Sequence, residues 1–501
     1  MGTIVGIDLG TTFCAVAQLD EVGRPVIVHN SSGANITPSV LTFEGASKIY
    51  VGEEARKQLG ERNTLGRFKR EMGTQTVYTT DGGDYTPRQL STFVLKKLKE
   101  ETEKKTGPIS EAVVTIPANF SNEAREDTLA AAKAAGLNVR YIINEPTAAA
   151  MYFAQTSGQE LGGVYAVFDL GGGTFDITIM RIHGKDIDVL ATEGVSRLGG
   201  DDFDEKIREI VSRKYAAEKG GTISPSDFTK NDAEDLKRDL STRADRTARA
   251  YGSAGRADIQ VFRAEFEESI STHIAQIEML CEAAIEEADI SISEIQEVIL
   301  AGGSTRVPAV QQSVERVFGR KPITFGNPDE VVALGAAVYA ALKAEAGNLN
   351  PLQKNAIAGV KLSEVTSKCY GTISVGFNEA KRSEELQNTV VIEKGTKIPC
   401  SITKTFYTAV EGQTEVACKV TECNTPETDP RFVRFIWEGE LGPLPPNRAE
   451  SKPVEVTFSY TVNQTMACSF LDVESGKTAK VELSQGAEQA SKFDIEKFVV
   501  E

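Results

Sequence analysis

The sequence predicts an α/β unit over residues 1–347, a linker over 348–361 and an all-β sandwich over 362–485. Strand and helix patterns alternate in the first part, whereas only strand patterns follow the linker. The length of 501 residues is also too great for one ordinary hydrophobic core. Residues 486–501 remain as a short tail with at most one short helix.

Composition narrows the function before any motif is considered. The net charge of −17 repels phosphate backbones, so nucleic acid is not expected as a partner. The first residues match neither a secretory signal nor a myristoylation site, and no apolar run approaches the ~20 residues of a membrane span. Seven cysteines without a CxxC pair, beside three histidines, favour reduced, buried thiols over a zinc site. We therefore expect a cytoplasmic protein that does not bind membranes.

Strands and helices alternate along the first half of the α/β unit. Short strands lie between Gly, Asp and Asn turns up to about residue 44, and apolar residues at helical spacing predict a helix over 86–105. A strand over 111–117 precedes a second helix, which begins after the N-cap residue Ser121 and ends at Gly136. Two further strands, VYAVFDL and DITIMRI, follow.

Residues 200–300 are mostly helical by pattern. One apolar stripe contains Phe266, Ile270, Ile274, Ile277, Leu280 and Cys281. A strand, a glycine turn and a helix are expected over 297–319, and a last helix ends at Gly347. After the linker, the stretch VEVTFSYTV alternates as a sandwich strand should, with Val454, Val456, Phe458, Tyr460 and Val462 on one face.

Two short stretches share one sequence motif: GIDLGTT, which begins at Gly6, and FDLGGGTFD, which begins at Phe168. Each ends an apolar strand in Asp, turns on glycine and continues into a strand, which makes it a hairpin and not a P-loop. Glycine lets the backbone N–H groups of such a turn approach phosphate oxygens closely. Asp8 and Asp169 would repel those phosphates unless a cation, of which Mg²⁺ is the natural candidate, lay between them.

Other interpretations of these glycine-containing stretches are weaker. One Asp-Gly turn alone could belong to an ordinary hairpin, but two matched copies favour phosphate binding. The stretch SGKT at Ser475 resembles the end of a Walker A motif, yet Leu471 stands where the first glycine is required. That stretch is therefore expected to be a hairpin turn. No GxGxxG motif follows a strand, so a dinucleotide fold is unsupported.

Several motifs occur together in one order: GIDLGTT, INEPTAAA, VFDLGGGTFD, LGGDDFD, AGGSTRVPAVQ and NPDEVVALGAAV. In these the chain resembles the seventy-kilodalton heat-shock (DnaK-type) chaperones, continuously over residues 3–345 and more weakly to 485. The resemblance implies a two-lobed, actin-like ATPase domain with a duplicated ribonuclease-H-like core, followed by a peptide-binding β-sandwich. It also implies Mg²⁺-dependent hydrolysis of ATP to ADP and phosphate, with K⁺ as a further candidate ion.

The resemblance further assigns roles to residues of the nucleotide site. Asp8 and Asp169 would hold Mg²⁺ through its waters, Lys69 would position the attacking water, and Glu145 and Asp176 would complete a ring of carboxylates. The two phosphate turns would contain Gly10, Thr11, Thr12 and Phe13, and Gly171, Gly172, Gly173 and Thr174, of which Thr174 is also assigned to catalysis. The remaining nucleotide-binding residues would be Gly199, Gly200, Glu234, Lys237, Arg238, Ser241, Gly302, Gly303, Ser304, Arg306 and Asp329.

Two further sets of residues follow from the resemblance alone. Pro117 and Arg125 would relay the nucleotide state to the sandwich. A groove for unfolded or extended polypeptide would be lined by Phe377, Ala380, Phe406, Ala409, Val416 and Cys418. Without the resemblance, Pro117 would be a strand-ending proline and the six groove residues plain sandwich core. J-domain cochaperones and nucleotide-exchange factors are candidate partners.

Four features depart from the family pattern. The linker reads NAIAGVKLSEV in place of an acidic residue before leucines, and too few residues follow Gln485 for a helical lid. Tyr141 replaces an arginine that family members use to dock J-domains, and the loop between KREMG and YTPRQL is short. These departures predict either fast peptide exchange or a groove that holds no peptide, and weaker or different coupling between the domains.

Three classes of function therefore remain open. The first is an ATP-hydrolysing chaperone, and the second is a lidless cochaperone or scaffold that binds ATP with little peptide-coupled hydrolysis. A small-molecule kinase or a filament-forming actin relative could use the same hairpins, but neither needs the sandwich. ATP turnover with and without peptide discriminates between the first two.

Overall fold

The structure is a computed structural model that describes residues 2–45, 47–158, 161–378, 382–447, 449–462, 464–482 and 495–501. These residues form two compact units. The first contains residues 2–119, 128–362 and 495–501, and the second contains residues 120–127 and 363–482. The predicted boundaries at 347 and 361 stay predictions. The predicted linker itself is structured, with a helix α11 (Pro351–Ile357) and the start of strand β18 (Lys361–Val365).

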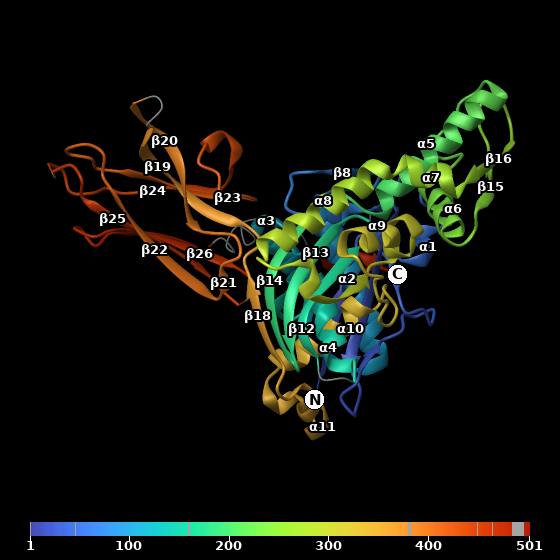
Figure 1. Ribbon diagram of the computed structural model, residues 1–501, viewed down its shortest axis with the longest axis horizontal. Helices are drawn as coiled ribbons and strands as arrows, with labels where there is room; N and C mark the ends of the chain where they lie inside the picture. The colour runs from blue at the N-terminus through green and yellow to red at the C-terminus, as the bar shows by residue number, and fades with distance from the viewer. Residues whose placement is uncertain are drawn as a thin grey trace. The chain divides into compact units, whose positions relative to one another are not determined.

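The first unit contains two sheets in which corresponding strands pair in the same way (Figure 1). In the first sheet, β1 (Thr3–Asp8) pairs antiparallel with β2 (Phe13–Leu19) and parallel with β10 (Ile109–Ile116). In the second, β12 (Gly162–Leu170) pairs antiparallel with β13 (Phe175–His183) and parallel with β17 (Ile295–Ala301). The strands β3 (Pro25–Ile27), β4 (Thr37–Pro38), β11 (Val139–Asn144) and β14 (Asp186–Val195) extend these sheets.

We call residues 2–158 of this unit the first lobe and residues 161–330 the second lobe. The two predicted hairpins are confirmed as β1–β2 and β12–β13, one in each lobe. Because each hairpin stands at the same position in its sheet, the repeat seen in the sequence is also a repeat of structure.

Two helices, α4 (Glu145–Thr156) and α10 (Val331–Lys343), pack against each other in the apolar core of this unit. Small residues let their backbones approach closely. A Cβ atom at Gly335 would lie 1.6 Å from the Ala148 carbonyl oxygen, and one at Gly6 would lie 2.2 Å from the Ala337 nitrogen. Glycine is therefore required where α10 crosses α4 and β1.

The predicted helices of the first half are confirmed. Helix α2 (Pro87–Thr106) begins at Thr86, whose hydroxyl accepts from the Gln89 N–H, and α3 (Asn122–Ala134) begins after Ser121, whose hydroxyl accepts from the Ala124 N–H. The other helices of the first unit are α1 (Glu53–Arg56), α5 (Gly200–Lys219), α6 (Lys230–Thr242), α7 (Arg263–Ser269), α8 (Ser271–Glu287) and α9 (Pro308–Phe318). Short 3₁₀ turns are η1 (Phe68–Glu71), η2 (Ile292–Glu294), η3 (Gly303–Arg306) and η4 (Ala346–Asn348).

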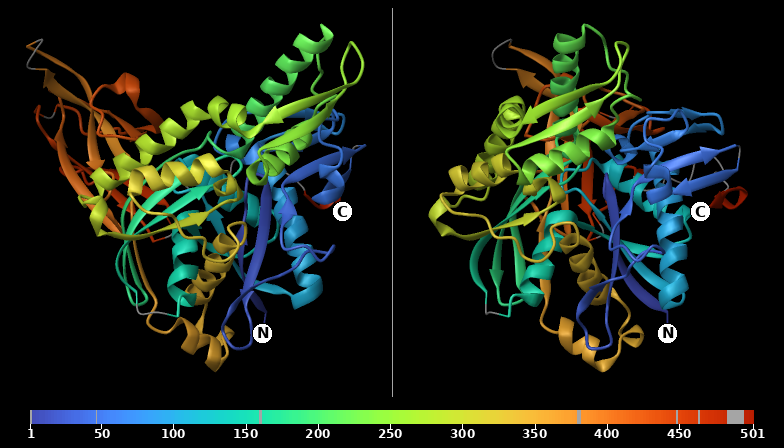
Figure 2. Two further views of the ribbon diagram at one scale, coloured as in Figure 1. Left: turned by 45° about the vertical axis from the view of Figure 1, so that its right-hand side comes forward. Right: turned by 90° about the vertical axis from the view of Figure 1, so that its right-hand side faces the viewer.

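The second lobe differs from the sequence prediction in one place. A hairpin, β15 (Asp245–Ala250) with β16 (Ala257–Phe262), stands between helices in a region predicted to be mostly helical (Figure 2). Its buried face includes Ala248, Ala250 and Ala257, and such small residues give a weak alternating signal. The predicted stripe along α7 and α8 is buried, as expected, although the helix breaks at Ile270.

Small strands complete the first lobe. One sheet contains β5 (Val40–Glu44), β6 (Lys48–Val51), β7 (Thr64–Gly66) and β28 (Val499–Val500), and a separate hairpin contains β8 (Tyr78–Thr80) and β9 (Gly83–Tyr85). Strand β28 and the turn η7 (Ile495–Lys497) belong to the predicted tail, whose residues 486–494 lie outside the described residues. Residues 495–501 thus contain a short strand beside a 3₁₀ turn, whereas the sequence predicted at most one short helix.

The second unit is a sandwich of two antiparallel sheets, as the sequence predicted. One sheet has the order β20 (Ser383–Ile392), β19 (Cys369–Asn378), β23 (Val416–Cys423), β24 (Arg434–Leu441), and the other has the order β22 (Cys400–Tyr407), β25 (Pro453–Tyr460), β26 (Met466–Asp472), β27 (Thr478–Glu482). Short elements are β21 (Lys397–Ile398) and η5 (Pro430–Phe432). The predicted alternating face is buried except for Val462, which lies beyond the end of β25 and is exposed.

Two smaller predictions are also confirmed. All seven cysteines are free, and every one except Cys400 is buried. The SGKT stretch lies in the turn between β26 and β27, where Ser475 bonds to Asp472 and Gly476 has a φ of 72°. It is a hairpin turn and not part of a P-loop.

Glu126 in α3 makes the second unit sensitive to pH. Burial, together with repulsion from Glu123 and Asp127, raises the pKa of Glu126 to about 7 from its usual 4.5, although Asn122 donates a hydrogen bond to it at 2.9 Å. The folded state therefore holds this proton more tightly than the unfolded state, and stability is lost as the pH rises from about 4.5 to 7.

We expect Glu126→Gln to raise the free energy of unfolding at pH 8 by about 1–2 kcal/mol, after allowance for solvent screening of a partly exposed group. At pH 4 the variant and the parent should be equal. Denaturant unfolding at the two pH values measures the difference, and Glu218→Gln at an exposed position is the control. An equal gain at both pH values would show that charge is not the cause.

Candidate functional site

The turns that follow β1 and β12 are shaped by their glycines. A Cβ atom at Gly10 would lie 1.9 Å from the Phe13 carbonyl oxygen, so only glycine fits the first turn. In the second turn, the Gly171 N–H donates to the Thr174 carbonyl at 3.1 Å, which returns the chain at once into β13. Both turns therefore carry a threonine beside a backbone with no obstructing side chain.

The second turn also packs directly on the N-terminus of α5. The Asp201 N–H donates to the Gly172 carbonyl at 2.7 Å, and the Gly200 N–H donates to the Gly171 carbonyl at 3.0 Å. A Cβ atom at Gly199 would lie 2.6 Å from the Gly172 carbonyl oxygen. Glycines at 172 and 199 thus allow two backbone segments to touch.

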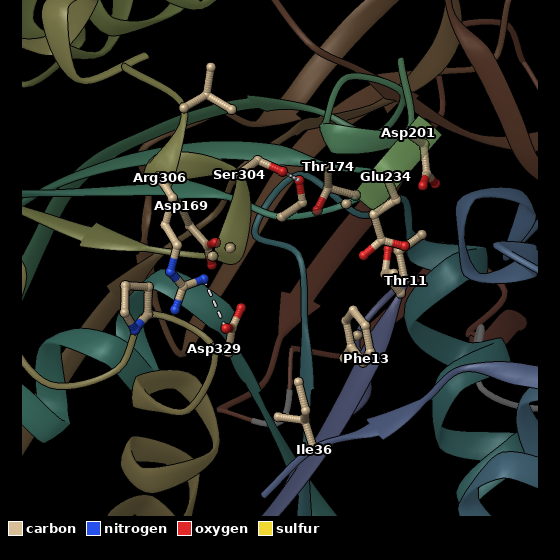
Figure 3. A pocket seen from close by; sticks show the side chains of 18 of the residues that line it. Thr11, Phe13, Ile36, Asp169, Thr174, Asp201, Glu234, Ser304, Arg306 and Asp329 are labelled. Carbon is tan, nitrogen blue, oxygen red and sulfur yellow. Dashed lines mark hydrogen bonds and ion pairs between the residues drawn. The ribbon is translucent and has the colours of Figure 1, made fainter. Parts of the chain in front are cut away.

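A cavity of about 420 Å³ lies where these turns meet α6 and η3 (Figure 3). Of the residues predicted for catalysis and nucleotide binding, all line this cavity except Gly173, Asp176, Gly199 and Gly200. The sequence analysis did not name seven further lining residues: Ile36, Asp201, Asp204, Thr242, Val307, Pro328 and Val332. Asp201 and Asp204 stand in LGGDDFD, next to the predicted Gly199 and Gly200. The apolar lining residues have no motif in the sequence that marks them.

Buried carboxylates gather at one end of the cavity around a single lysine. Lys69 Nζ lies 2.5 Å from Glu145 Oε1. Burial and the charge of Glu145 raise the pKa of Asp8 to about 7, and burial with Glu145 and Asp176 raises the pKa of Asp169 well above its usual value. Burial would lower the pKa of Lys69, but Glu145 and Asp8 outweigh it and that pKa is raised. This end of the cavity has an excess of negative charge that a cation would relieve.

The backbone holds these side chains in place. Asp8 ends β1 and accepts from the Thr115 hydroxyl at 2.9 Å, and Asp176 lies behind the cavity wall, where it accepts from the Asn119 N–H at 3.1 Å. Lys69 lies in η1, and Arg67, the residue directly before η1, has a φ of 64°. Arg67 is thus a non-glycine residue in the left-handed region, next to the predicted catalytic lysine.

The other end of the cavity is lined by α6 and η3. Burial alone would raise the pKa of Glu234, but Arg238 and Lys237 outweigh it and the pKa is lowered. The Phe13 ring lies 5.4 Å from the Arg238 guanidinium, which can stack on its face. Figure 3 shows Arg306 and its ion-pair partner Asp329 on the opposite side of the cavity from Glu234.

The polar atoms that remain in the cavity fit a phosphate ligand and its magnesium ion. Thr12 Oγ1 and Asp201 Oδ2 are buried and have no hydrogen-bond partner among the described residues. Within the same residues, no three acidic, histidine or cysteine side chains stand close enough to bind a metal directly. Asp8 and Asp169 both line the cavity, and their role in holding magnesium through its waters stays a prediction.

The family model described as Hsp70 protein matches residues 4–501 of the chain. The chain belongs to the Hsp70 family. The predicted fold class is thereby confirmed: an actin-like ATPase unit with paired lobes and a β-sandwich unit. Hsp70 proteins are chaperones that bind ATP and ADP with Mg²⁺, and ATPase activity is general in the family. No helix among the described residues is long and apolar enough to cross a membrane.

The two predicted relay residues of this Hsp70 chain fall in different units. Pro117 is buried directly after β10 in the first unit. Arg125 belongs to the second unit and is 2% exposed; it donates to the Phe120 carbonyl at 3.2 Å and contacts the side chains of Ser367 and Gln464. These acceptors explain how the sandwich tolerates a buried guanidinium. The relay itself remains a prediction.

The six residues predicted for the Hsp70 peptide groove do not share one environment. Phe377 is 63% exposed and Ala409 is exposed, whereas Phe406 and Val416 are partly buried against the sandwich core. Ala380 lies outside the described residues. Cys418 is fully buried in the core, because alternate residues of β23 point inward, so its side chain is not available to a ligand.

Arg67 connects the two lobes at the nucleotide cavity. Its Nε lies 2.6 Å from Asp201 Oδ1, and both side chains are buried. We expect Arg67→Ala to raise the dissociation rate of ATP at least about tenfold, because an unpaired buried carboxylate costs about 3–5 kcal/mol and favours opening of the cavity. Stopped-flow release of a fluorescent ATP analogue measures the rate. Arg62→Ala, which removes an exposed arginine paired with Asp81 at 3.2 Å, should leave the rate unchanged.

Proposed function

We propose that this Hsp70 chain hydrolyses ATP and uses its nucleotide state to control the binding of unfolded or extended polypeptide. The observation that carries the proposal is the buried Lys69–Glu145 pair beside Asp8 and Asp169, at the end of the cavity that both glycine turns reach. A purely structural nucleotide site would not need a buried ammonium group among these carboxylates.

The chemistry follows from positions and charges. The glycine turns and the hydroxyls of Thr11, Thr12 and Thr174 would bind the phosphates. Lys69, held by Glu145, would orient a water molecule in line with the γ-phosphorus and offset charge on the phosphate oxygens. The bond from the water oxygen forms as the bond to ADP breaks, so no covalent intermediate with the protein is needed. Magnesium, when bound, supplies neutralisation of charge between the carboxylates and the phosphates.

Exposed apolar side chains of the sandwich support the peptide-binding half of the proposal. Val375 and Leu386 are cross-strand partners on β19 and β20, and they are 50% and 63% exposed. Phe377 lies two residues further along the same face of β19 and is 63% exposed. An extended apolar segment could cover such a row of side chains without strict sequence preference.

A cochaperone or scaffold is the second candidate. Tyr141, at the position where the family docks J-domains through an arginine, packs edge-on against Tyr339 at 6.5 Å and lies under the Lys343 ammonium at 5.3 Å. Tyr141 itself supplies no guanidinium, and the neighbouring Arg140 pairs with Glu345 at 3.2 Å. J-domain proteins and nucleotide-exchange factors remain candidate partners under either function.

The proposal includes a cytoplasmic location. Seven free thiols suit a reducing compartment, where disulfides are rare. The test is retention of all seven thiols in protein trapped directly from cells by an alkylating reagent.

Single-turnover hydrolysis of ATP by the full chain, with and without an unfolded model peptide, tests the function. A chaperone should hydrolyse ATP, accelerate with peptide and bind labelled peptide more weakly with ATP than with ADP. A hydrolysis rate that does not change with peptide, together with equal peptide affinity in both nucleotide states, would favour the cochaperone or scaffold. If the chain binds ATP and never hydrolyses it, the proposed ATPase activity is wrong.

A further inference from the structure

The last described residues, 495–501, lie on the first lobe, far from the turns of the nucleotide cavity along the chain. Strand β28 pairs in parallel with β6, so that Val499 stands opposite Lys48 and Val500 opposite Ile49. Figure 2 shows this red segment beside the blue strands of the first lobe in both views. The pairing joins parts of the sequence that no local pattern connects.

A continuous set of backbone hydrogen bonds holds the segment. The Val499 N–H donates to the Ser47 carbonyl at 2.9 Å, and the Glu501 N–H donates to the Ile49 carbonyl at 2.8 Å. In return, the Val51 N–H donates to the Glu501 carbonyl at 2.8 Å. Each donor and acceptor is of the kind that a free sheet edge offers to an incoming strand.

Side chains of the segment enter the apolar core of the first lobe. Phe498 packs edge-on against Phe93 at 5.0 Å and Tyr85 at 6.2 Å, and Ile495 is 7% exposed. Val500 packs against the same core, whereas Val499 points outward and is 58% exposed. The core of the lobe thus receives an aliphatic and an aromatic side chain spaced three residues apart.

Acidic side chains at both ends of the segment pair with lysines of the first lobe. Lys48 Nζ lies 3.2 Å from the Glu501 carboxylate, and Lys96 Nζ lies 3.6 Å from the Glu496 carboxylate. Lys96 also donates to the Ile495 carbonyl at 3.5 Å. These contacts are partly exposed and weak singly, but they fix the register of the strand.

We propose that the edge of β6, with the apolar surface formed by Tyr85 and Phe93, is a peptide-acceptor site, and that residues 495–501 of the same chain are its resident ligand. The segment binds by strand addition, and it can leave and return without unfolding of the lobe. The sandwich precedes this segment in the chain. Residues of the first unit therefore stand on both sides of the sandwich in the sequence. The site is separate from the nucleotide cavity and from the predicted groove.

The test uses the full chain with Val499→Pro, which removes the N–H that donates to Ser47. Hydrogen exchange of the Val51 amide should become at least about tenfold faster, because its acceptor leaves with the segment. Val499→Thr keeps the N–H and changes an exposed side chain, so it should exchange like the parent. Equal exchange in all three proteins would overturn the proposal.

Binding of a fluorescein-labelled peptide of residues 491–501 gives the second measurement. The Val499→Pro chain should bind it at least about tenfold more tightly than the parent, whose site is filled. The same peptide with Phe498→Ala should not bind. Equal weak binding to both chains would contradict an acceptor site, and a concentration-dependent dimer of the parent that Val499→Pro abolishes would contradict occupancy by the same chain.

A charge reversal keeps the proposal testable if the proline variant does not fold. Lys48→Glu alone should accelerate exchange at Val51, and Glu501→Lys in the same chain should restore protection. Absence of both effects would count against the site. None of these measurements depends on ATP hydrolysis, so this inference and the proposed function can fail separately.

Discussion

Replacing Lys69 with alanine is expected to slow hydrolysis of bound ATP by at least about 100-fold, which corresponds to about 2.7 kcal/mol of lost transition-state stabilisation. Lys69 is the only ammonium group within contact of Glu145 in the described residues, and it is 3% exposed. Charge on the γ-phosphate oxygens would then develop beside carboxylates alone. Affinity for ATP should change by only about fivefold, because the glycine turns still bind the phosphates.

Single-turnover hydrolysis with radiolabelled ATP, at saturating protein and Mg²⁺, measures the chemical step without product release. Lys57→Ala is the matched control, since Lys57 is exposed and pairs with Glu54 on the surface at 2.7 Å. Parental rates in Lys69→Ala would mean that the buried pair serves folding and not catalysis. Binding is measured separately with a fluorescent ATP analogue, so that a loss of affinity is not mistaken for a loss of chemistry.

Gly335→Ala is expected to lower the free energy of unfolding by about 3 kcal/mol or more, at the upper end of what overpacking costs. The new methyl group would lie 1.6 Å from the Ala148 carbonyl oxygen, which is backbone and cannot rotate away. Helix propensity alone predicts the opposite sign, because alanine in a helix interior is favoured over glycine by about 1 kcal/mol. The direction of the change therefore separates packing from propensity.

Denaturant unfolding monitored by circular dichroism measures the loss. Gly162→Ala is the control, because nothing lies within 4 Å of a Cβ atom there and its φ is not in the left-handed region. Its effect should stay within about 0.5 kcal/mol. A stabilised Gly335→Ala chain would show that α10 can move away from α4, and the close crossing would then not be required.

The duplicated hairpins could be predicted from sequence because their signals are local. An Asp at the end of an apolar run, followed by glycine and threonine, dictates a turn whatever surrounds it. Lys69 and Glu145 have no such signal. A lysine in GRFKREMG looks exposed by residue type, and its burial results from the contact with a helix that begins 76 residues later. Only the resemblance to a known family could single it out.

The remaining differences have equally physical causes. Ile36 and Val332 line the cavity because distant segments meet there, and apolar residues of this kind are common in any core. The sequence does not say which residues of β23 face inward, and Cys418 proved to be core. Strand β28 is only two residues long, so no window of sequence could reveal it.

Strand β6 is synthesised long before β28, the strand that pairs with its edge. Strand β6 forms from residues 48–51, but its neighbour β28 is made about 450 residues later. At about 5–20 residues per second, the ribosome needs roughly 20–90 s to supply that neighbour. During this interval the nascent first lobe exposes an open sheet edge and the apolar surface of Tyr85 and Phe93, both of which promote association with other chains. Residues 495–501 can cover this edge only after the sandwich that precedes them has been synthesised.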